Sequence, residues 1–155
     1  MTSEERIASL ERKIRALQMA YTGALADSVL RYSRAGILDE VTKQKRDEQM
    51  KTGAALAERL GIREPKQAFG NVQDLFNCAD WAYEDTETGF TATCGNCMLC
   101  ALCKKMGTGN PCQIYCLSPI EASIKGIKPD AEFTVEKTLW DDKRCEVKVS
   151  YRKQA

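Results

Sequence analysis

The chain has 155 residues, and its 23 lysine and arginine and 22 aspartate and glutamate side chains give a formal net charge of +1. This length is sufficient for one domain with a hydrophobic core. The balanced charge gives no bulk attraction toward nucleic acid or anionic membranes, so neither partner is expected. No run of about 18 apolar residues predicts a transmembrane helix, and the charged beginning, MTSEERIASLERKIRAL, has no apolar signal-peptide core. We therefore expect a cytoplasmic protein.

The first third of the chain has the apolar periodicity of helices. Thr2 and Glu5 have the spacing of a capping box. Apolar residues then recur at spacings of three and four, at Ile7, Leu10, Ile14, Leu17 and Tyr21. We expect a helix that ends near Gly36 and a second over about 39–60 with Gly61 as its cap. The stripe fits a helix packed on its own core, which we favour, or a coiled coil that makes a homodimer through the N-terminal helices.

The middle of the chain predicts a linker, a short helix and a hairpin. Pro65 and Gly70 frame the linker, and the apolar residues that follow indicate a helix over about 72–79 with Cys78 near its apolar side. The next segment, WAYEDTETGFTATC, is typical of a hairpin with its turn around 87–89.

The last third predicts one more helix and a second strand pair. The segment CQIYCLSPIEASIKGI indicates the helix, in which Pro119 is best placed in the first turn. Residues 133–139 and 145–151 alternate apolar and polar side chains, with Lys137 as the one break, around a turn at Asp141 and Asp142.

Together these elements predict the α+β class. We expect N-terminal helices followed by a small antiparallel sheet of about four strands, with a cysteine-rich helical or loop segment inserted between the two hairpins. We expect one domain over 1–155, with a helical N-terminal part over 1–62 and a cysteine-rich α+β part over 71–152.

Six of the eight cysteines lie in one short segment. They are Cys94, Cys97, Cys100, Cys103, Cys112 and Cys116. Thiolates are the preferred protein ligands of iron–sulfur clusters and structural zinc. In a reducing compartment, such a group indicates metal binding or redox chemistry before disulfides, with free or catalytic thiols as a further alternative. The chain has no histidine, which excludes Ser–His–Asp and Cys–His catalysis.

Spacing limits how these six thiols can act together. Four cysteines three residues apart cannot share one face of a helix, so the run is either a loop or divided between roles. Cys112 and Cys116 would share a helix face and could complete a four-sulfur site with two thiolates of the run. The contiguous run favours an iron–sulfur cluster of the [4Fe–4S] type over zinc, because zinc ribbons separate their cysteine pairs by roughly 15–20 residues. Cys78 and Cys145 lie apart, and we expect both to pack as small apolar residues.

The C-terminal half also resembles a known family. The pattern is Cys97, five residues, Cys103, a glycine-containing stretch, Cys112, three residues and Cys116, followed by KTLWDDKRCEVKV. It resembles the L-2-amino-thiazoline-4-carboxylate hydrolase-like family over about residues 78–150, and it is more weakly similar to small-molecule-binding domains of the four-vinyl-reductase type. The resemblance implies the fold more firmly than the hydrolase reaction. Cys94 and Cys100 lie outside the family pattern and favour a cluster-binding variant.

Three functions follow as hypotheses. The first is an iron–sulfur or zinc-binding protein for electron transfer or for redox or ligand sensing, with a redox protein as its partner. The alternative is a hydrolase-like enzyme acting on a small thiazoline-type substrate, through a thiolate such as Cys97 or Cys112 or through metal-activated water. Its base would be an aspartate, glutamate, lysine or tyrosine. The third is an interaction module whose fold is held by zinc.

Overall fold

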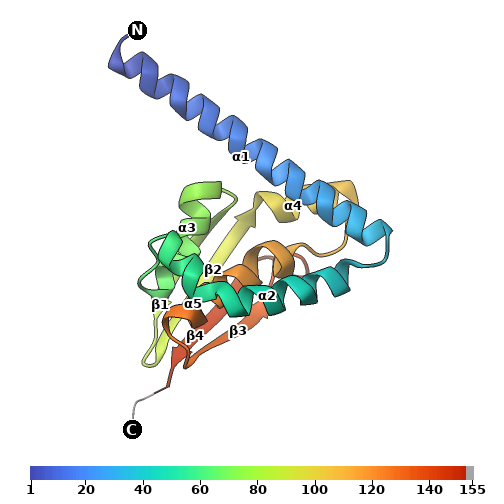
Figure 1. The fold of residues 1–155 in the computed structure, drawn as a ribbon, viewed down its shortest axis with the longest axis vertical. Coiled ribbons are helices and arrows are strands. Elements are labelled where there is room, and N and C mark those ends of the chain that lie inside the picture. Colours follow the sequence, from blue (N-terminus) through green and yellow to red (C-terminus); the bar gives the residue numbers. More distant parts are fainter. Residues whose placement is uncertain (153–155) are drawn as a thin grey trace.

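The computed structural model describes residues 1–152, except for the side chains of residues 72 and 73. The elements in chain order are α1 (Ser3–Arg34), α2 (Leu38–Arg59), α3 (Pro65–Phe76), β1 (Ala79–Asp85), β2 (Gly89–Cys97), α4 (Met98–Met106), the π-helical η1 (Gln113–Leu117), α5 (Ser118–Ile127), β3 (Ala131–Lys137) and β4 (Cys145–Tyr151). Helices precede an antiparallel sheet with the cysteine-rich segment between its hairpins, as Figure 1 shows, so the predicted α+β class is confirmed. No helix in the described part of the chain is both long enough and apolar enough to span a membrane.

The first two helices begin and end where the sequence predicts. Thr2 accepts the N–H of Glu5 at 3.2 Å, and the Glu5 carboxylate accepts the N–H of Thr2 at 2.7 Å, which completes the capping box. Gly36 and Gly61 follow α1 and α2 with φ of 71° and 68°, a left-handed conformation that favours glycine.

The prediction for the segment after α2 is wrong in two respects. Pro65 begins α3 instead of a linker, because its fixed φ suits the first turn of a helix. The helix continues through Gly70 and ends at Phe76, where Asn77 adopts a φ of 48°. Cys78 therefore lies outside the helix, immediately before β1.

The sheet has the strand order β1-β2-β4-β3, with every neighbouring pair antiparallel. One face is buried, and Phe90, Val147 and Val149 lie on it under α3 and α5. Phe69 of α3 anchors this core with an edge-on contact to Trp81, their ring centroids 4.9 Å apart. The two predicted hairpins are confirmed, and the middle strands β2 and β4 join them.

A second, smaller core lies between α1 and the cysteine-rich segment. Ala26 and Val29 of α1 pack against Leu99 and Cys103 of α4 and Ile114 of η1. The first half of α1 instead projects beyond the rest of the molecule (Figure 1). Its apolar stripe is exposed, so the favoured prediction that this stripe packs on the protein's own core is wrong for residues 7–17.

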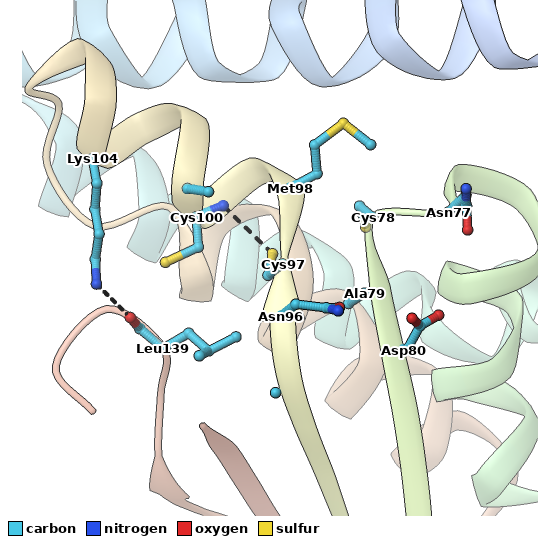
Figure 2. A pocket seen from close by; sticks show the side chains of 12 residues that line it. Asn77, Cys78, Ala79, Asp80, Asn96, Cys97, Met98, Cys100, Lys104 and Leu139 are labelled. Atoms are coloured by element: carbon cyan, nitrogen blue, oxygen red, sulfur yellow. Dashed lines mark hydrogen bonds between the residues drawn. The ribbon is translucent and has the colours of Figure 1, made fainter. Parts of the chain in front are cut away.

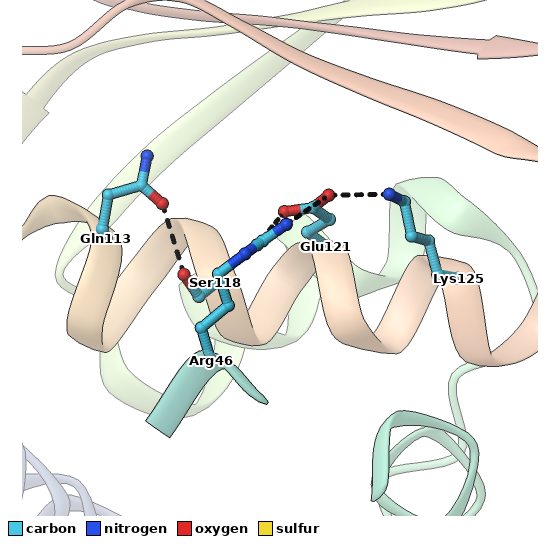
Figure 3. A network of polar contacts seen from close by, with 5 residues as sticks. All are labelled: Arg46, Gln113, Ser118, Glu121 and Lys125. Carbon is cyan, nitrogen blue, oxygen red and sulfur yellow. Dashed lines mark hydrogen bonds and ion pairs between the residues drawn. The ribbon is translucent and has the colours of Figure 1, made fainter. Parts of the chain in front are cut away.

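Helices α2 and α5 are joined by a buried charge. Glu121 of α5 accepts hydrogen bonds from Arg46 of α2, one of them at 3.2 Å, and from Lys125 at 2.9 Å (Figure 3). Burial by itself would raise the pKa of Glu121, but the hydrogen bonds from Arg46 and Lys125 outweigh it and lower that pKa. Glu121 is therefore a carboxylate that fixes α2 against α5.

Two glycines let these helices touch through their backbones. A Cβ at Gly53 would overlap the carbonyl of Ala122, and a Cβ at Gly126 would overlap the backbone of Ala54. Because backbone cannot move aside as a flexible side chain can, the helix crossing requires glycine at both positions.

We expect Gly53→Ala to lower the free energy of unfolding by about 1–3 kcal/mol, because the added methyl forces α2 away from α5. The matched control is Gly23→Ala in α1, where nothing lies within 4 Å of the added Cβ. That change should be neutral or stabilising by up to about 1 kcal/mol, through helix propensity alone. Urea unfolding of both variants measures this, and equal stabilities would contradict the backbone contact.

Candidate active site

An open cleft of about 560 Å³ lies where β1 and β2 meet α4. Polar side chains from three elements line it, among them Asp80 of β1, Asn96 of β2 and Lys104 of α4 (Figure 2). The Lys104 ammonium also donates to the carbonyl of Leu139 at 2.6 Å, which holds it at the rim. The cleft thus presents a carboxylate, an amide and an ammonium group.

An irregularity in strand pairing creates the cleft. Ala79 pairs with Cys97 and Trp81 pairs with Cys94, so one residue of β1 lies opposite two residues of β2. Such a bulge redirects side chains at the end of a sheet. Here it places Asp80 beside Asn96, and Figure 2 shows the Asn96 amide extending toward β1.

Cys97 lines the cleft at the junction between β2 and α4. It ends β2 and is the N-cap of α4, and its Sγ accepts the N–H of Cys100 at 3.4 Å. It also lines two further cavities, a small apolar one of about 20 Å³ and an apolar chamber of about 350 Å³ formed by α1, α2, α3 and the η1–α5 segment. A partly buried thiol at a helix N-terminus, on the wall of a cleft, is an arrangement in which protein thiols can become nucleophilic.

The structure brings most of the predicted cysteines together. All eight are free thiols. The small apolar cavity is lined by six of them, namely Cys94, Cys97, Cys100, Cys112, Cys116 and Cys145. Cys103 instead packs in the second core against α1. The predicted run is therefore divided between a strand and a helix, as the geometry of three-residue spacing requires.

Two cysteines that the sequence placed apart lie beside this group. Cys145 of β4 is directly opposite Cys94 of β2, and it lines the small cavity while remaining part of the core. Cys78 lines the open cleft and the apolar chamber. The register of β4 against β2 places Cys145 beside Cys94, and the end of α3 at Phe76 leaves Cys78 just before β1.

Sequence reasoning also missed Asp80, Asn77 and Asn96 as cleft residues. Asn96 lies inside the C-x-x-C run, yet its pairing opposite β1 depends on the bulge, which no local pattern announces. The one sequence feature that could have identified these cleft residues is their position close to cysteines at the ends of two predicted strands.

The thiols are not arranged as a preformed metal site. In the part of the chain that the structure describes, no three histidine, cysteine, aspartate or glutamate side chains are placed to hold a metal ion. The predicted iron–sulfur or zinc ligation by Cys94, Cys97, Cys100, Cys103, Cys112 and Cys116 therefore stays a prediction.

Burial raises the pKa of every cysteine in the group. The pKa rises to about 11 for Cys78 and Cys145, and further for Cys112 and Cys116. For Cys97, burial also raises the pKa, and the backbone N–H groups of Cys100 and Leu99 offset only part of that rise. Near neutral pH the inner thiols are therefore protonated, and Cys97 combines access to the cleft with donors that favour its thiolate.

The fold and site define a small α+β protein with a cysteine-centred cleft at one end of its sheet. The sequence model of the family described as L-2-amino-thiazoline-4-carboxylic acid hydrolase matches residues 11–149, so the chain belongs to this family. The match includes most of α1 and all of α2 and α3, so it extends well beyond residues 78–150, which carry the resemblance in the sequence. Comparison with curated proteins and with solved structures gives no significant match.

We expect the free energy of unfolding to fall as pH rises from 9.0 through about 11, because Cys78 and Cys145 keep their protons in the folded state after the unfolded chain has lost them. Cys145→Ala removes one of these groups and should reduce the total decline by about 1–3 kcal/mol. Urea unfolding under reducing conditions across this pH range measures both slopes. A variant that declines as steeply as the unmodified chain would contradict the burial of this thiol.

Proposed function

We propose that this protein is a cysteine-dependent hydrolase that opens a small thiazoline-type ring, with Cys97 as its nucleophile. The observation that carries the proposal is the position of the Cys97 Sγ, at the N-cap of α4, accepting the Cys100 N–H on the wall of the cleft. Membership of a family named for the hydrolysis of L-2-amino-thiazoline-4-carboxylic acid supports the reaction class.

The N-terminus of α4 supplies one part of what histidine supplies in other thiol enzymes, namely donors that stabilise the charge of the thiolate. Backbone N–H groups and the positive end of the helix dipole stabilise a thiolate relative to a thiol. Asp80 lines the same cleft and has an exposed side chain, so it is the candidate base.

The remaining polar groups of the cleft match the charges of such a substrate. Lys104 offers an ammonium to the ring carboxylate, since its Nζ is held at the rim by the Leu139 carbonyl. Asn77 and Asn96 offer amide groups to the ring nitrogen and the exocyclic amine. The substrate would bind with its carboxylate toward α4 and its ring over Cys97.

The proposed reaction has two covalent steps. The Cys97 thiolate attacks the carbon between the ring sulfur and the ring nitrogen, and the ring C–S bond breaks as the ring sulfur leaves and takes a proton from solvent. The carbon is then bonded to Cys97 as an isothiourea. Water attacks the same carbon, Asp80 accepts a proton from that water and later releases it to solvent, and the Cys97 thiolate leaves. The cycle consumes one water and regenerates the thiolate.

We expect the full chain to hydrolyse L-2-amino-thiazoline-4-carboxylate, measured by mass spectrometry of the ring-opened product. Cys97→Ser should lower kcat by at least about 10³-fold, because a serine hydroxyl remains protonated without a histidine. Asp80→Asn should lower kcat by about 10²-fold or more. Lys104→Met should chiefly raise KM, since the ammonium contacts the carboxylate in the ground state and the transition state alike.

Cys103→Ala is the matched control, because Cys103 lies on the same helix but packs against α1. It should retain near-normal kcat once its folding is confirmed by urea unfolding. Turnover that survives Cys97→Ser would overturn the assignment of the nucleophile, and no turnover of any thiazoline-type substrate would overturn the proposed function.

A second candidate is a thiolate-bound iron–sulfur or zinc cofactor, which would serve electron transfer or redox sensing with a redox protein as its partner. The observation that favours it is that six thiols line one small cavity. Side chains would have to rotate to ligate, because no three in the described residues are placed to hold a metal ion.

Metal and sulfide analysis of anaerobically purified protein separates the two candidates. If hydrolysis proceeds through the thiol alone, we expect much less than one metal ion per chain and turnover that persists after chelation. Stoichiometric iron with sulfide and visible absorbance would favour the cluster. Turnover that is lost on chelation and restored by the metal would favour metal-activated water over the Cys97 nucleophile.

A further inference from the structure

The projecting half of α1 carries an apolar stripe that nothing in the described structure covers. Ile7, Leu10, Ile14 and Leu17 lie between 53% and 71% exposed, on a segment that extends beyond the domain (Figure 1). Contiguous apolar surface of this kind on a protein is characteristic of an interaction site. The stripe recurs at alternating steps of three and four residues, which is the spacing of a coiled-coil seam.

We propose that this segment forms a parallel, two-stranded coiled coil with the same segment of a second copy of the chain. In the heptad notation abcdefg, Ile7 and Ile14 occupy position a, and Leu10 and Leu17 occupy position d. Isoleucine at a with leucine at d favours two parallel strands over three or four. Two copies would bury the four residues of each helix against their equivalents.

Charges beside the seam complement themselves in this arrangement. Arg6 occupies position g and Glu11 occupies position e of the next heptad. A parallel pair places Arg6 of each helix against Glu11 of the other, which gives two attractive contacts by symmetry. An antiparallel pair would instead bring position g against position g, with Arg6 near Lys13 and like charges opposed. The charge pattern therefore favours a second copy of this segment as the partner, in the parallel orientation.

The structure also fixes where the free seam ends. Gln18 donates from its side-chain amide to the Leu75 carbonyl at 3.0 Å, and Tyr21 stacks on Phe76 with ring centroids 4.8 Å apart. From Gln18 onward α1 is therefore docked on its own domain. Residues 3–17 form a free segment about 22 Å long, which two copies can share while both domains lie at the same end.

The free segment enters the association already helical. The capping box at Thr2 and Glu5 closes its beginning, and the docked half of α1 continues it at the other end. A separate peptide of this length would be marginally helical in water, because nucleation is costly. With the helix preformed, a seam of only two heptads can support a weak but specific dimer.

Sedimentation equilibrium of the full chain, from low micromolar to several hundred micromolar, tests the proposal. The expected result is a reversible monomer–dimer equilibrium. Leu10→Glu should raise the dissociation constant at least about a hundredfold, because it places a charge in each copy's seam. The matched control is Met19→Glu, which makes the same kind of change at another exposed apolar position, outside the seam. It should change the constant by no more than about threefold.

A charge exchange tests partner and direction together. Arg6→Glu alone and Glu11→Arg alone should each weaken the homodimer. In either variant, both contacts between positions 6 and 11 of the two copies would join side chains of the same charge. An equimolar mixture of these two variants should form a heterodimer tighter than either homodimer, and added salt should reduce that preference. A monomer at every concentration, a dimer indifferent to Leu10→Glu, or a mixture without heterodimer preference would overturn the proposal. None of these outcomes depends on the hydrolase activity.

Discussion

The architecture of the site depends on one junction, at which Cys97 ends β2 and caps α4. Strand β2 is hydrogen-bonded on both edges, to β1 and to β4, so its end is fixed relative to the sheet. Because the cap is formed by the last residue of that strand, the direction of α4 is set by the sheet. The positions of Cys100 and Lys104 on α4 follow from the same constraint, as does the opening of the cleft between α4 and β1.

The thiols around this junction have different chemical roles because their surroundings differ. Burial raises the pKa of Cys112, Cys116 and Cys145, so these thiols act in the free protein as small apolar side chains. Cys94 donates its S–H to the carbonyl of Asn96 at 2.7 Å, and burial raises its pKa. Cys97 alone in the group combines the open cleft with helix N-terminal donors. A bound metal would reverse this order by deprotonating its ligands, which is why the metal content is the decisive measurement for the second candidate.

Much of the fold could be predicted from sequence, since local rules govern it. The capping box and Gly36 delimit α1, polar turn residues indicate the first hairpin, and near-regular alternation indicates the second. The prediction was wrong where two local signals compete. Pro65 is an example, because proline is common both in linkers and at the first position of a helix. The candidate site was partly predictable, because cysteine density identified the region. Its polar residues were not, since a bulge in the pairing of β1 with β2 brings Asp80 to Asn96, and pairing is a property of the whole sheet.

The apolar periodicity of α1 also leaves the tertiary contacts undetermined, because the two halves of this helix share one pattern but are covered differently. A stripe at spacings of three and four residues shows that a helix face is apolar, but it does not identify what covers that face. In α1 the later part of the helix covers the molecule's own core through Ala26 and Val29, against Leu99 and Cys103 of α4. The same part contributes Tyr21 and Leu25 to the apolar chamber that Cys97 borders. Because α1 is one continuous helix, association through its first half would restrain the wall of that chamber and the packing of α4, while making no contact with the cleft itself.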